Sequence, residues 1–355
     1  MNNYQLIPHA KLSANKLVIY DELVGYVRKK NNTSFTPTDN YRLNYSGIMS
    51  KSANKKIKKI IDMWLCCLET KKYTSRKNND WLRYQITFCT LTLPSAQIHC
   101  DKEIKRECLN NFIIELKRKT NIKTYLCVSE KQDNKNIHFH ILFSGFIDWK
   151  LIRNTWNNCI AKLGYIDTYR KNQNEFHKDG FKLRTELIDK WSEVKQLLAY
   201  KKGLAENWTN PNSTDIHALD KIKNIGAYVT KYICKGIDIK FADELKKYDL
   251  TVLPENDAKE LQKNVFDKLK EHYKIKGKVW SCSENLEKLN TCDFIIDSDL
   301  DLAIRDLVYG NNADVYKGDC FTVAKGNVLK ELKNKSPSYY NIFLEIQNIN
   351  YKLLY

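Results

Sequence analysis

Two histidines separated by one residue, His138 and His140, have the spacing of a metal site. They lie in residues 136–145 (NIHFHILFSG), where apolar residues alternate with them. In an extended strand, successive side chains point to opposite faces, so the two imidazoles share one face and the apolar residues line the other. Imidazole is a common ligand of divalent metals, so the pair predicts a metal site. The alternative is a half-buried strand with two histidines on its outer face by chance.

Glu130 is the third candidate ligand, because it ends another strand-like run at residues 123–130 (KTYLCVSE). The polar residues 131–136 (KQDNKN) between the two runs have the composition of a hairpin loop. If the two strands pair, Glu130 comes near the histidines, whereas a slip of one residue turns it to the opposite face. A solvated acid at a loop edge is the alternative for Glu130 alone.

Tyr228 and Tyr232 lie one helical turn apart in residues 225–236 (IGAYVTKYICKG). On a helix, both phenols share one face with the amine of Lys235, while Lys231 lies between them in sequence. Two tyrosines beside an apolar stripe are the alternative for an arbitrary helix. The nearby His-x-His run favours a role in chemistry instead.

These motifs, in this order, resemble the HUH endonuclease superfamily. A Thr-rich run at residues 88–94 (FCTLTLP) is similar to its first motif, His138-Phe139-His140 to its metal motif, and the Tyr-x-x-x-Tyr segment to its nucleophile motif. In particular, the chain resembles the two-tyrosine replication initiators (Rep) of microviruses and related single-stranded DNA phages. A weaker similarity at residues 280–286 (WSCSENL) extends the resemblance over residues 84 to about 286.

The resemblance implies a rolling-circle replication initiator, which is a metal-dependent DNA endonuclease and strand transferase. Such an enzyme nicks single-stranded origin DNA by tyrosine attack, keeps a 5′-phosphotyrosine link, and leaves a 3′-OH for a host DNA polymerase working with a host helicase. The metal ligands would be His138, His140 and Glu130, a set that suits Mn²⁺ and tolerates Mg²⁺.

The implied nucleophiles are Tyr228 and Tyr232, which would alternate between holding the old 5′ end and attacking the regenerated junction. Lys231 and Lys235 are candidates for lowering the phenol pKa or gripping the phosphate, and we favour Lys235 because it shares the tyrosine face. The alternative for each lysine is a solvated cation near a helix C-terminus.

Composition is consistent with a nucleic-acid partner. The 355 residues contain 59 Lys and Arg against 42 Asp and Glu, and the net charge of +17 favours a polyanionic partner. Eleven cysteines without a Cys-x-x-Cys pair indicate reduced thiols in a cytoplasm, that of the host cell if a phage encodes the chain. No apolar run has the length of a membrane span, so we expect a soluble protein without a membrane partner. No P-loop motif occurs, which argues against an ATP-driven helicase domain.

The pattern of elements predicts an α+β fold. Strands at 84–93, 123–130 and 137–144 alternate with helices at 101–119 and from Asp148 to Gly164, which indicates a central antiparallel sheet of split βαβ (ferredoxin-like) topology with helices on one face. The last strand is either residues 181–187 or residues 214–219. Further helices are expected at 53–68, 189–204 and 257–273.

We expect three parts along the chain. Residues 1–80 form an N-terminal accessory segment, residues 81–238 the HUH nuclease domain with an insertion at about 164–213, and residues 239–355 a mostly helical C-terminal region. Two other functions compete with replication initiation: an HUH relaxase or transposase for mobilisation, and a non-catalytic binder of single-stranded nucleic acid that uses charge and aromatic side chains alone.

Overall fold

The computed structural model describes residues 5–24, 47–75, 85–217, 237–248, 254–310 and 313–355. Contacts divide them into two compact units. The unit that we call the His-x-His unit comprises the described residues within 43–51 and 83–282, and the terminal unit comprises those within 1–42, 52–82 and 283–355. The predicted three-part division remains a prediction, because the units are defined by contacts and not by independent folding.

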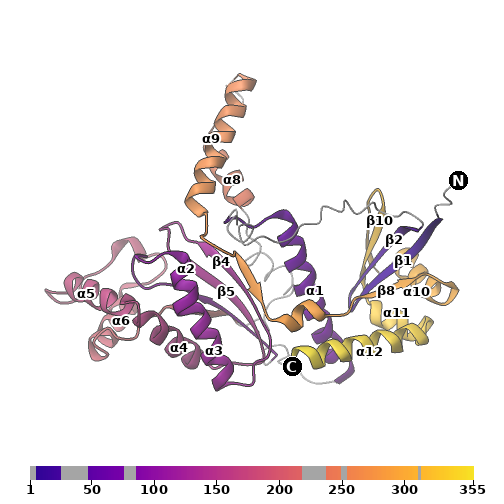
Figure 1. Cartoon of the computed structure of the whole chain (residues 1–355), viewed down its shortest axis with the longest axis horizontal. Helices are drawn as coiled ribbons and strands as arrows, with labels where there is room; N and C mark the ends of the chain where they lie inside the picture. The colour runs from indigo at the N-terminus through magenta and orange to yellow at the C-terminus, as the bar shows by residue number, and fades with distance from the viewer. Residues whose placement is uncertain (1–4, 25–46, 76–84, 218–236, 249–253, 311–312) are drawn as a thin grey trace, which may run out of the picture. The chain divides into compact units, whose positions relative to one another are not determined.

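A five-stranded antiparallel sheet with the order β6-β3-β5-β4-β7 forms the centre of the His-x-His unit (Figure 1). Its strands are β3 (Ile86–Leu91), β4 (Tyr125–Lys131), β5 (Ile137–Ser144), β6 (Thr214–His217) and β7 (Trp280–Cys282). The three predicted strands are therefore confirmed. Of the two candidates for the next strand, residues 214–217 pair with β3, whereas residues 181–187 form no strand.

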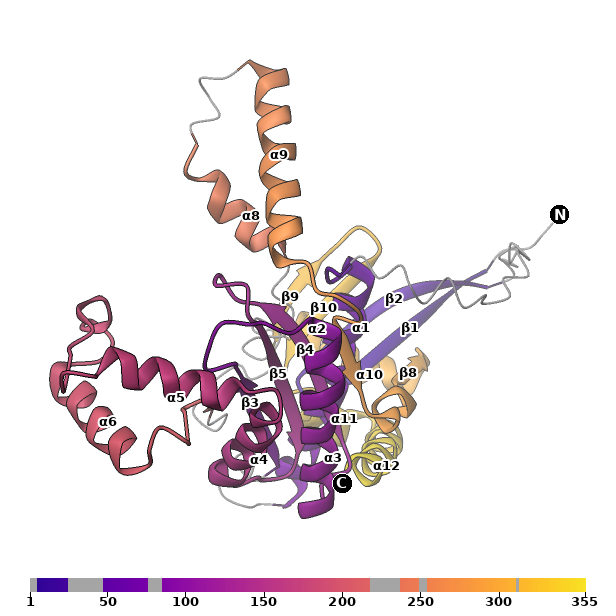
Figure 2. The same ribbon diagram turned by 60° about the vertical axis from the view of Figure 1, so that its left-hand side comes forward.

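One face of this sheet is covered by helices (Figure 2). The predicted helix at 101–119 consists of α2 (Asp101–Ile104), a π-helical turn (Lys105–Asn110) and α3 (Asn111–Lys119). Apolar residues at every fourth position of this segment are fully buried against the sheet, namely Ile104, Cys108, Phe112 and Leu116. The helix α4 (Trp149–Ala161) packs beside it and begins at Asp148, as predicted, where the carboxylate accepts hydrogen bonds from the backbone N–H groups of Lys150 and Leu151.

Two helical additions extend from the His-x-His unit. Between α4 and β6 lie α5 (Tyr165–Phe176), a short 3₁₀ turn (Thr185–Leu187) and α6 (Glu193–Ala205). Before β7, α8 (Ile237–Leu245) and α9 (Glu255–Tyr273) lie side by side as a helical hairpin (Figure 2). The helices predicted at 189–204 and 257–273 are confirmed with small shifts at their ends.

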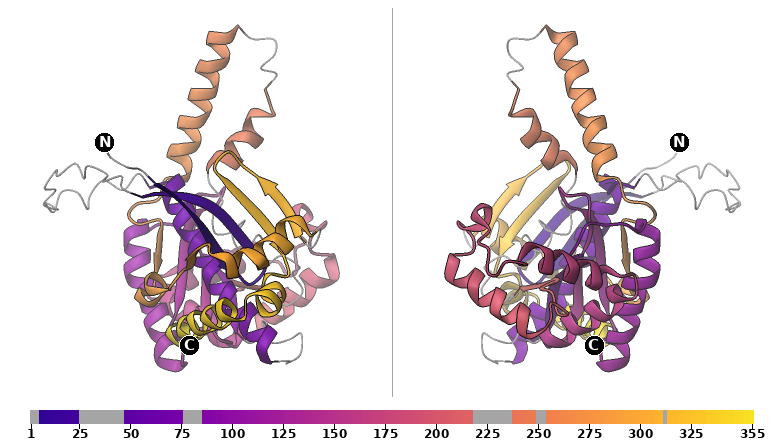
Figure 3. Two further views of the ribbon diagram at one scale, coloured as in Figure 1. Left: turned by 90° about the vertical axis from the view of Figure 1, so that its right-hand side faces the viewer. Right: turned by 90° about the vertical axis from the view of Figure 1, so that its left-hand side faces the viewer.

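The terminal unit contains a second five-stranded antiparallel sheet, so the expectation of mostly helical flanks is wrong. Its order is β8-β1-β2-β10-β9, with the strands β1 (Gln5–Ser13), β2 (Lys16–Val24), β8 (Cys292–Ile295), β9 (Ala313–Lys317) and β10 (Phe321–Gly326). Four helices complete the unit: α1 (Lys51–Ser75), which contains the helix predicted at 53–68, α10 (Ser298–Tyr309), α11 (Val328–Lys335) and α12 (Pro337–Leu354). The helices α10, α11 and α12 bury apolar side chains against this second sheet (Figure 3).

Among the described residues, no helix is both long and apolar enough to cross a membrane.

Candidate metal centre

The pairing of β4 with β5 determines which face Glu130 occupies. Glu130 lies directly opposite His138, and Val128 lies opposite His140. Residues that face each other in an antiparallel pair project to the same side of the sheet, so Glu130 shares the face of both histidines. The register slip left open by the sequence does not occur. Phe139, between the histidines, is fully buried in the core on the other face.

The three side chains converge on one point. Nε2 of His138 and Nε2 of His140 each lie 3.2 Å from the same oxygen, Oε2 of Glu130. One ligand atom from each residue lies within 4.8 Å of the others, and the two imidazole rings are 4.6 Å apart at 72°. The exposed fractions of the side chains are 13% for His138, 6% for His140 and 18% for Glu130. A small cation therefore has three donors within reach in a mostly desolvated place.

The charge of the site is set by Glu130. Burial alone would raise its pKa, but the hydrogen bonds and the charge interactions with His138 and His140 outweigh burial and lower the pKa to about 2. Glu130 is therefore an anion throughout the neutral pH range. A site of two imidazoles and one carboxylate carries a negative charge that favours a divalent cation.

Thr90 on β3 orients one of the two imidazoles. It lies opposite His140 in the β3–β5 register, and its Oγ1 is 3.0 Å from Nδ1 of His140. When Nδ1 carries the proton and donates it to Thr90, Nε2 presents its lone pair to a cation. Nδ1 of His138 is buried with no hydrogen-bond partner among the described residues. His140 is therefore the better oriented of the two predicted ligands.

The hairpin loop holds the two strands without a glycine. Lys135 takes the left-handed conformation with φ of +66°, a position that glycine often occupies. The side chain of Asn136 accepts a hydrogen bond of 2.8 Å from the backbone N–H of Gln97 and donates one of 2.8 Å to the carbonyl of Ser95. These bonds attach the loop to the segment before α2, which helps to fix the register that places Glu130.

Three residues on this face were not assigned to the site from the sequence. Thr90 is His140's hydrogen-bond partner, and Asp215 on β6 lies opposite Thr90, with its side chain exposed. Trp280 on β7 lies opposite Val128 at the other side of the sheet. The alternation in residues 88–94 could have indicated Thr90. Asp215 and Trp280 could be placed only once β6 and β7 were known to be the edge strands.

The structure leaves the predicted nucleophiles untested. Tyr228, Lys231, Tyr232 and Lys235 lie outside the described residues, between the end of β6 at His217 and the start of α8 at Ile237. Their roles rest on the sequence.

The part of the chain that carries these motifs can be compared with known families. Residues 86–237 match the family of replication-associated proteins described as ORF2 or gene 2 protein. This stretch, which we call the replication-family region, begins at the first residue of β3 and contains Glu130, both histidines and the tyrosine segment. Comparisons with curated proteins and with solved structures gave no significant match. The family match supports a role in replication.

Proposed function

We propose that this chain is a rolling-circle replication initiator, a metal-dependent nuclease that nicks and rejoins single-stranded origin DNA. The observation that carries the proposal is the convergence of Glu130, His138 and His140 on one face of the β4–β5 pair, inside the replication-family region. The strand order β6-β3-β5-β4, with helices after β3 and after β5, supports the split βαβ arrangement of the HUH endonucleases.

The three converging side chains suit a divalent ion. Two imidazoles and a carboxylate favour Mn²⁺ over Mg²⁺, which prefers an all-oxygen set. When bound, the ion would polarise the scissile phosphate and offset the charge that develops on it. The chain contributes the permanent anion of Glu130 and, through Thr90, the proton arrangement on His140.

The covalent step belongs to the tyrosine segment. The phenol oxygen of Tyr228 or Tyr232 would form a bond to phosphorus while the bond to the 3′ oxygen breaks, and the phenol proton ends on the departing 3′-OH. The 5′ end then stays on the tyrosine, and a host polymerase can extend the 3′-OH beside a host helicase. The second tyrosine repeats the attack at the regenerated junction, which permits strand joining. Lys235, and with less weight Lys231, would hold the phosphate or favour the phenolate.

The test is incubation of the full chain with single-stranded circular DNA and Mn²⁺, followed by a denaturing gel. We expect a covalent protein–DNA adduct with the parent chain and none after His138→Ala/His140→Ala, while most nonspecific DNA affinity remains because Lys and Arg contacts to phosphate supply it. His9→Ala in the terminal unit removes an imidazole elsewhere and should leave the adduct unchanged. Undiminished nicking by the double variant would place the metal site elsewhere. DNA binding without any adduct from the parent chain would favour the non-catalytic binder.

A further inference from the structure

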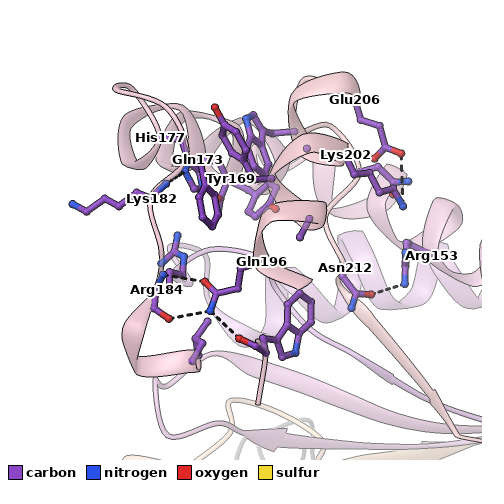
Figure 4. Close-up of a pocket in the computed structure, with 18 residues that line it drawn as sticks. Arg153, Tyr169, Gln173, His177, Lys182, Arg184, Gln196, Lys202, Glu206 and Asn212 are labelled. Carbon is purple, nitrogen blue, oxygen red and sulfur yellow. Dashed lines mark hydrogen bonds and ion pairs between the residues drawn. The ribbon is translucent and has the colours of Figure 1, made fainter. Parts of the chain in front are cut away.

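A pocket lies in the insertion between α4 and β6, apart from the three metal-ligand candidates. It has a volume of about 360 Å³ and is lined mainly by α5, α6 and the loops at residues 177–191 and 206–212 (Figure 4). Pockets that bind small organic groups have volumes of roughly 300–1,000 Å³. No metal-ligand candidate lines it, so it requires its own explanation.

Aromatic rings form much of the lining. His177 stacks on Trp208 with ring centroids 5.5 Å apart and planes within 2°, and on Phe181 at 6.3 Å and 13°. Tyr200 lies 4.7 Å from His177 and 5.6 Å from Phe181, and Tyr169 meets Trp208 edge-on. Trp208 is buried, whereas the rings of His177, Phe181 and Tyr200 are half-buried and retain exposed surface. Flat π surfaces of this kind bind flat ligands by stacking.

The backbone accepts strain in order to place Trp208. Asn207 and Trp208 have φ of +47° and +52°, and this left-handed conformation is unfavourable for a residue as large as tryptophan. Gly203 on α6 makes room for the indole, since a Cβ there would lie 2.0 Å from a ring carbon of Trp208. The Trp208 Nε1–H is buried with no acceptor among the described residues. These features describe a preformed aromatic wall.

A second wall is fixed by one glutamine. The side chain of Gln196 donates hydrogen bonds to the carbonyls of Arg184 (3.0 Å) and Trp191 (2.9 Å), and accepts one from the backbone N–H of Arg184 (2.9 Å). Gln196 is buried on α6, so the loop that carries Arg184 is held against this helix. The pocket is therefore open but ordered on both sides.

The charge around the pocket is mainly positive. Four lining residues are cationic (Arg153, Lys182, Arg184 and Lys202), and the only acidic one is Glu206, which lies 3.8 Å from Lys202. Lys182 and Arg184 lie on one side of the hollow and Arg153 on the other (Figure 4). Within the described part of the chain, neither Arg184 nor Lys182 has an ion-pair partner, and both lie over the ring of Phe176. This distribution fits a flat group attached to phosphates.

We propose that this pocket binds one unpaired nucleobase of single-stranded DNA. The aromatic rings would stack on the base, the side-chain amides of the lining, such as Gln173 and Asn212, offer partners for its polar edge, and the cations contact the flanking phosphates. The inference rests on the proposed function for the choice of DNA as ligand. It adds a place where the strand is held by a base, away from the metal ligands.

The test compares two strands with the same backbone. The full chain is titrated, in EDTA so that no cleavage occurs, with a labelled 20-nucleotide strand that contains all four bases and with a 20-unit strand that is abasic throughout. Tyr200→Ala should reduce the preference for the base-containing strand about fivefold or more, because stacking on one base is worth at least that factor. Tyr200→Phe keeps the ring and should keep the preference. Tyr309→Ala removes an exposed ring from the terminal unit and should also change nothing.

A different outcome overturns the inference. Equal loss of affinity for both strands after Tyr200→Ala means that the ring does not contact a base, and so does an unchanged preference. If Tyr200→Ala does not fold, Phe181→Ala in the loop replaces it with the same expected result. Arg184→Gln should weaken both strands alike and leave the preference intact, because it removes a phosphate contact. Adduct formation with Mn²⁺ is measured separately, so failure of the nuclease proposal and failure of the base pocket give different results.

Discussion

The ammonium of Lys131 and the carboxylate of Asp101 lie 2.6 Å apart, one residue beyond Glu130. Both side chains are largely buried, with exposed fractions of 11% and 4%. Asp101 also accepts hydrogen bonds from the side chain of Gln97 (2.7 Å) and from the backbone N–H of Lys276 (2.9 Å). The start of α2, the end of β4 and the segment before β7 therefore meet at one carboxylate, which fixes the strand end that carries Glu130.

Asp101→Asn should destabilise the His-x-His unit strongly. The substitution keeps the shape but removes the negative charge, and leaving a buried Lys131 without its partner costs about 3–5 kcal/mol. Urea unfolding at neutral pH measures the loss. Glu255→Gln breaks an exposed ion pair with Lys259 on α9 and serves as the matched control, with little expected change. Equal effects of the two substitutions would show that the buried pair does not hold the fold.

The same carboxylate predicts a dependence of stability on pH. Burial opposes ionisation of Asp101, but the hydrogen bonds from Lys131, Gln97 and the backbone of Lys276 outweigh it and lower its pKa. A lowered pKa stabilises the folded state above the unfolded value of about 4, and this contribution is lost as the pH falls through the folded value. The stability difference between the parent chain and Asp101→Asn should therefore be largest near pH 7 and shrink below pH 4. A difference that grows in acid would contradict this account.

Thr90→Val should weaken metal binding without removing a ligand. The substitution keeps the size and the strand propensity of residue 90 but deletes the oxygen 3.0 Å from Nδ1 of His140. Loss of such an orienting partner typically lowers metal affinity about 10- to 100-fold. Calorimetric titration with Mn²⁺ measures the change, and Thr90→Ser, which keeps the hydroxyl, should bind as the parent does. An unchanged affinity in Thr90→Val would show that His140 is oriented by other contacts.

The metal centre was predictable because its parts are close in sequence. His138 and His140 share a face by strand alternation, and a six-residue loop brings Glu130 to the same strand end. Only the register remained open, and the hydrogen bonds between β4 and β5 determine it. Thr90 escaped assignment because its neighbour His140 lies fifty positions later, across a pairing that no local pattern specifies.

The second sheet was not predictable for a related reason. Strand β1 pairs with β8, so residues such as His9 and Ile295 meet from opposite ends of the sequence. Pro8 within β1 argues against an internal strand, because proline cannot donate a ladder hydrogen bond. In the structure its carbonyl still accepts a bond from the backbone N–H of Ile296, at 2.9 Å. The alternation at residues 181–187 was misleading in the opposite sense, because Gln196 binds that segment as a loop.

Tyr228→Phe and Tyr232→Phe test the nucleophile assignment, which rests on the sequence. Each substitution removes one phenol oxygen with little change in volume, so each single variant should lose nicking unequally according to which tyrosine attacks first. The double variant should form no covalent adduct on the denaturing gel, and strand joining should require both residues. A DNA-linked double variant would refute the assignment. Full nicking and joining with a single tyrosine would indicate a one-tyrosine nuclease.

Gly203→Ala separates the base pocket from the metal centre. The added methyl group would lie 2.0 Å from the ring of Trp208, so the indole must leave its position and the stack with His177 is lost. Alanine is the better helix former by up to about 1 kcal/mol, which limits the loss of stability in α6. We expect the preference for base-containing over abasic DNA to fall and adduct formation with Mn²⁺ on long single strands to persist. Leu204→Ala, at the next and exposed position, is the control and should preserve both. A Gly203→Ala chain that retains its full preference for bases would show that the aromatic wall formed by Trp208 does not hold the strand.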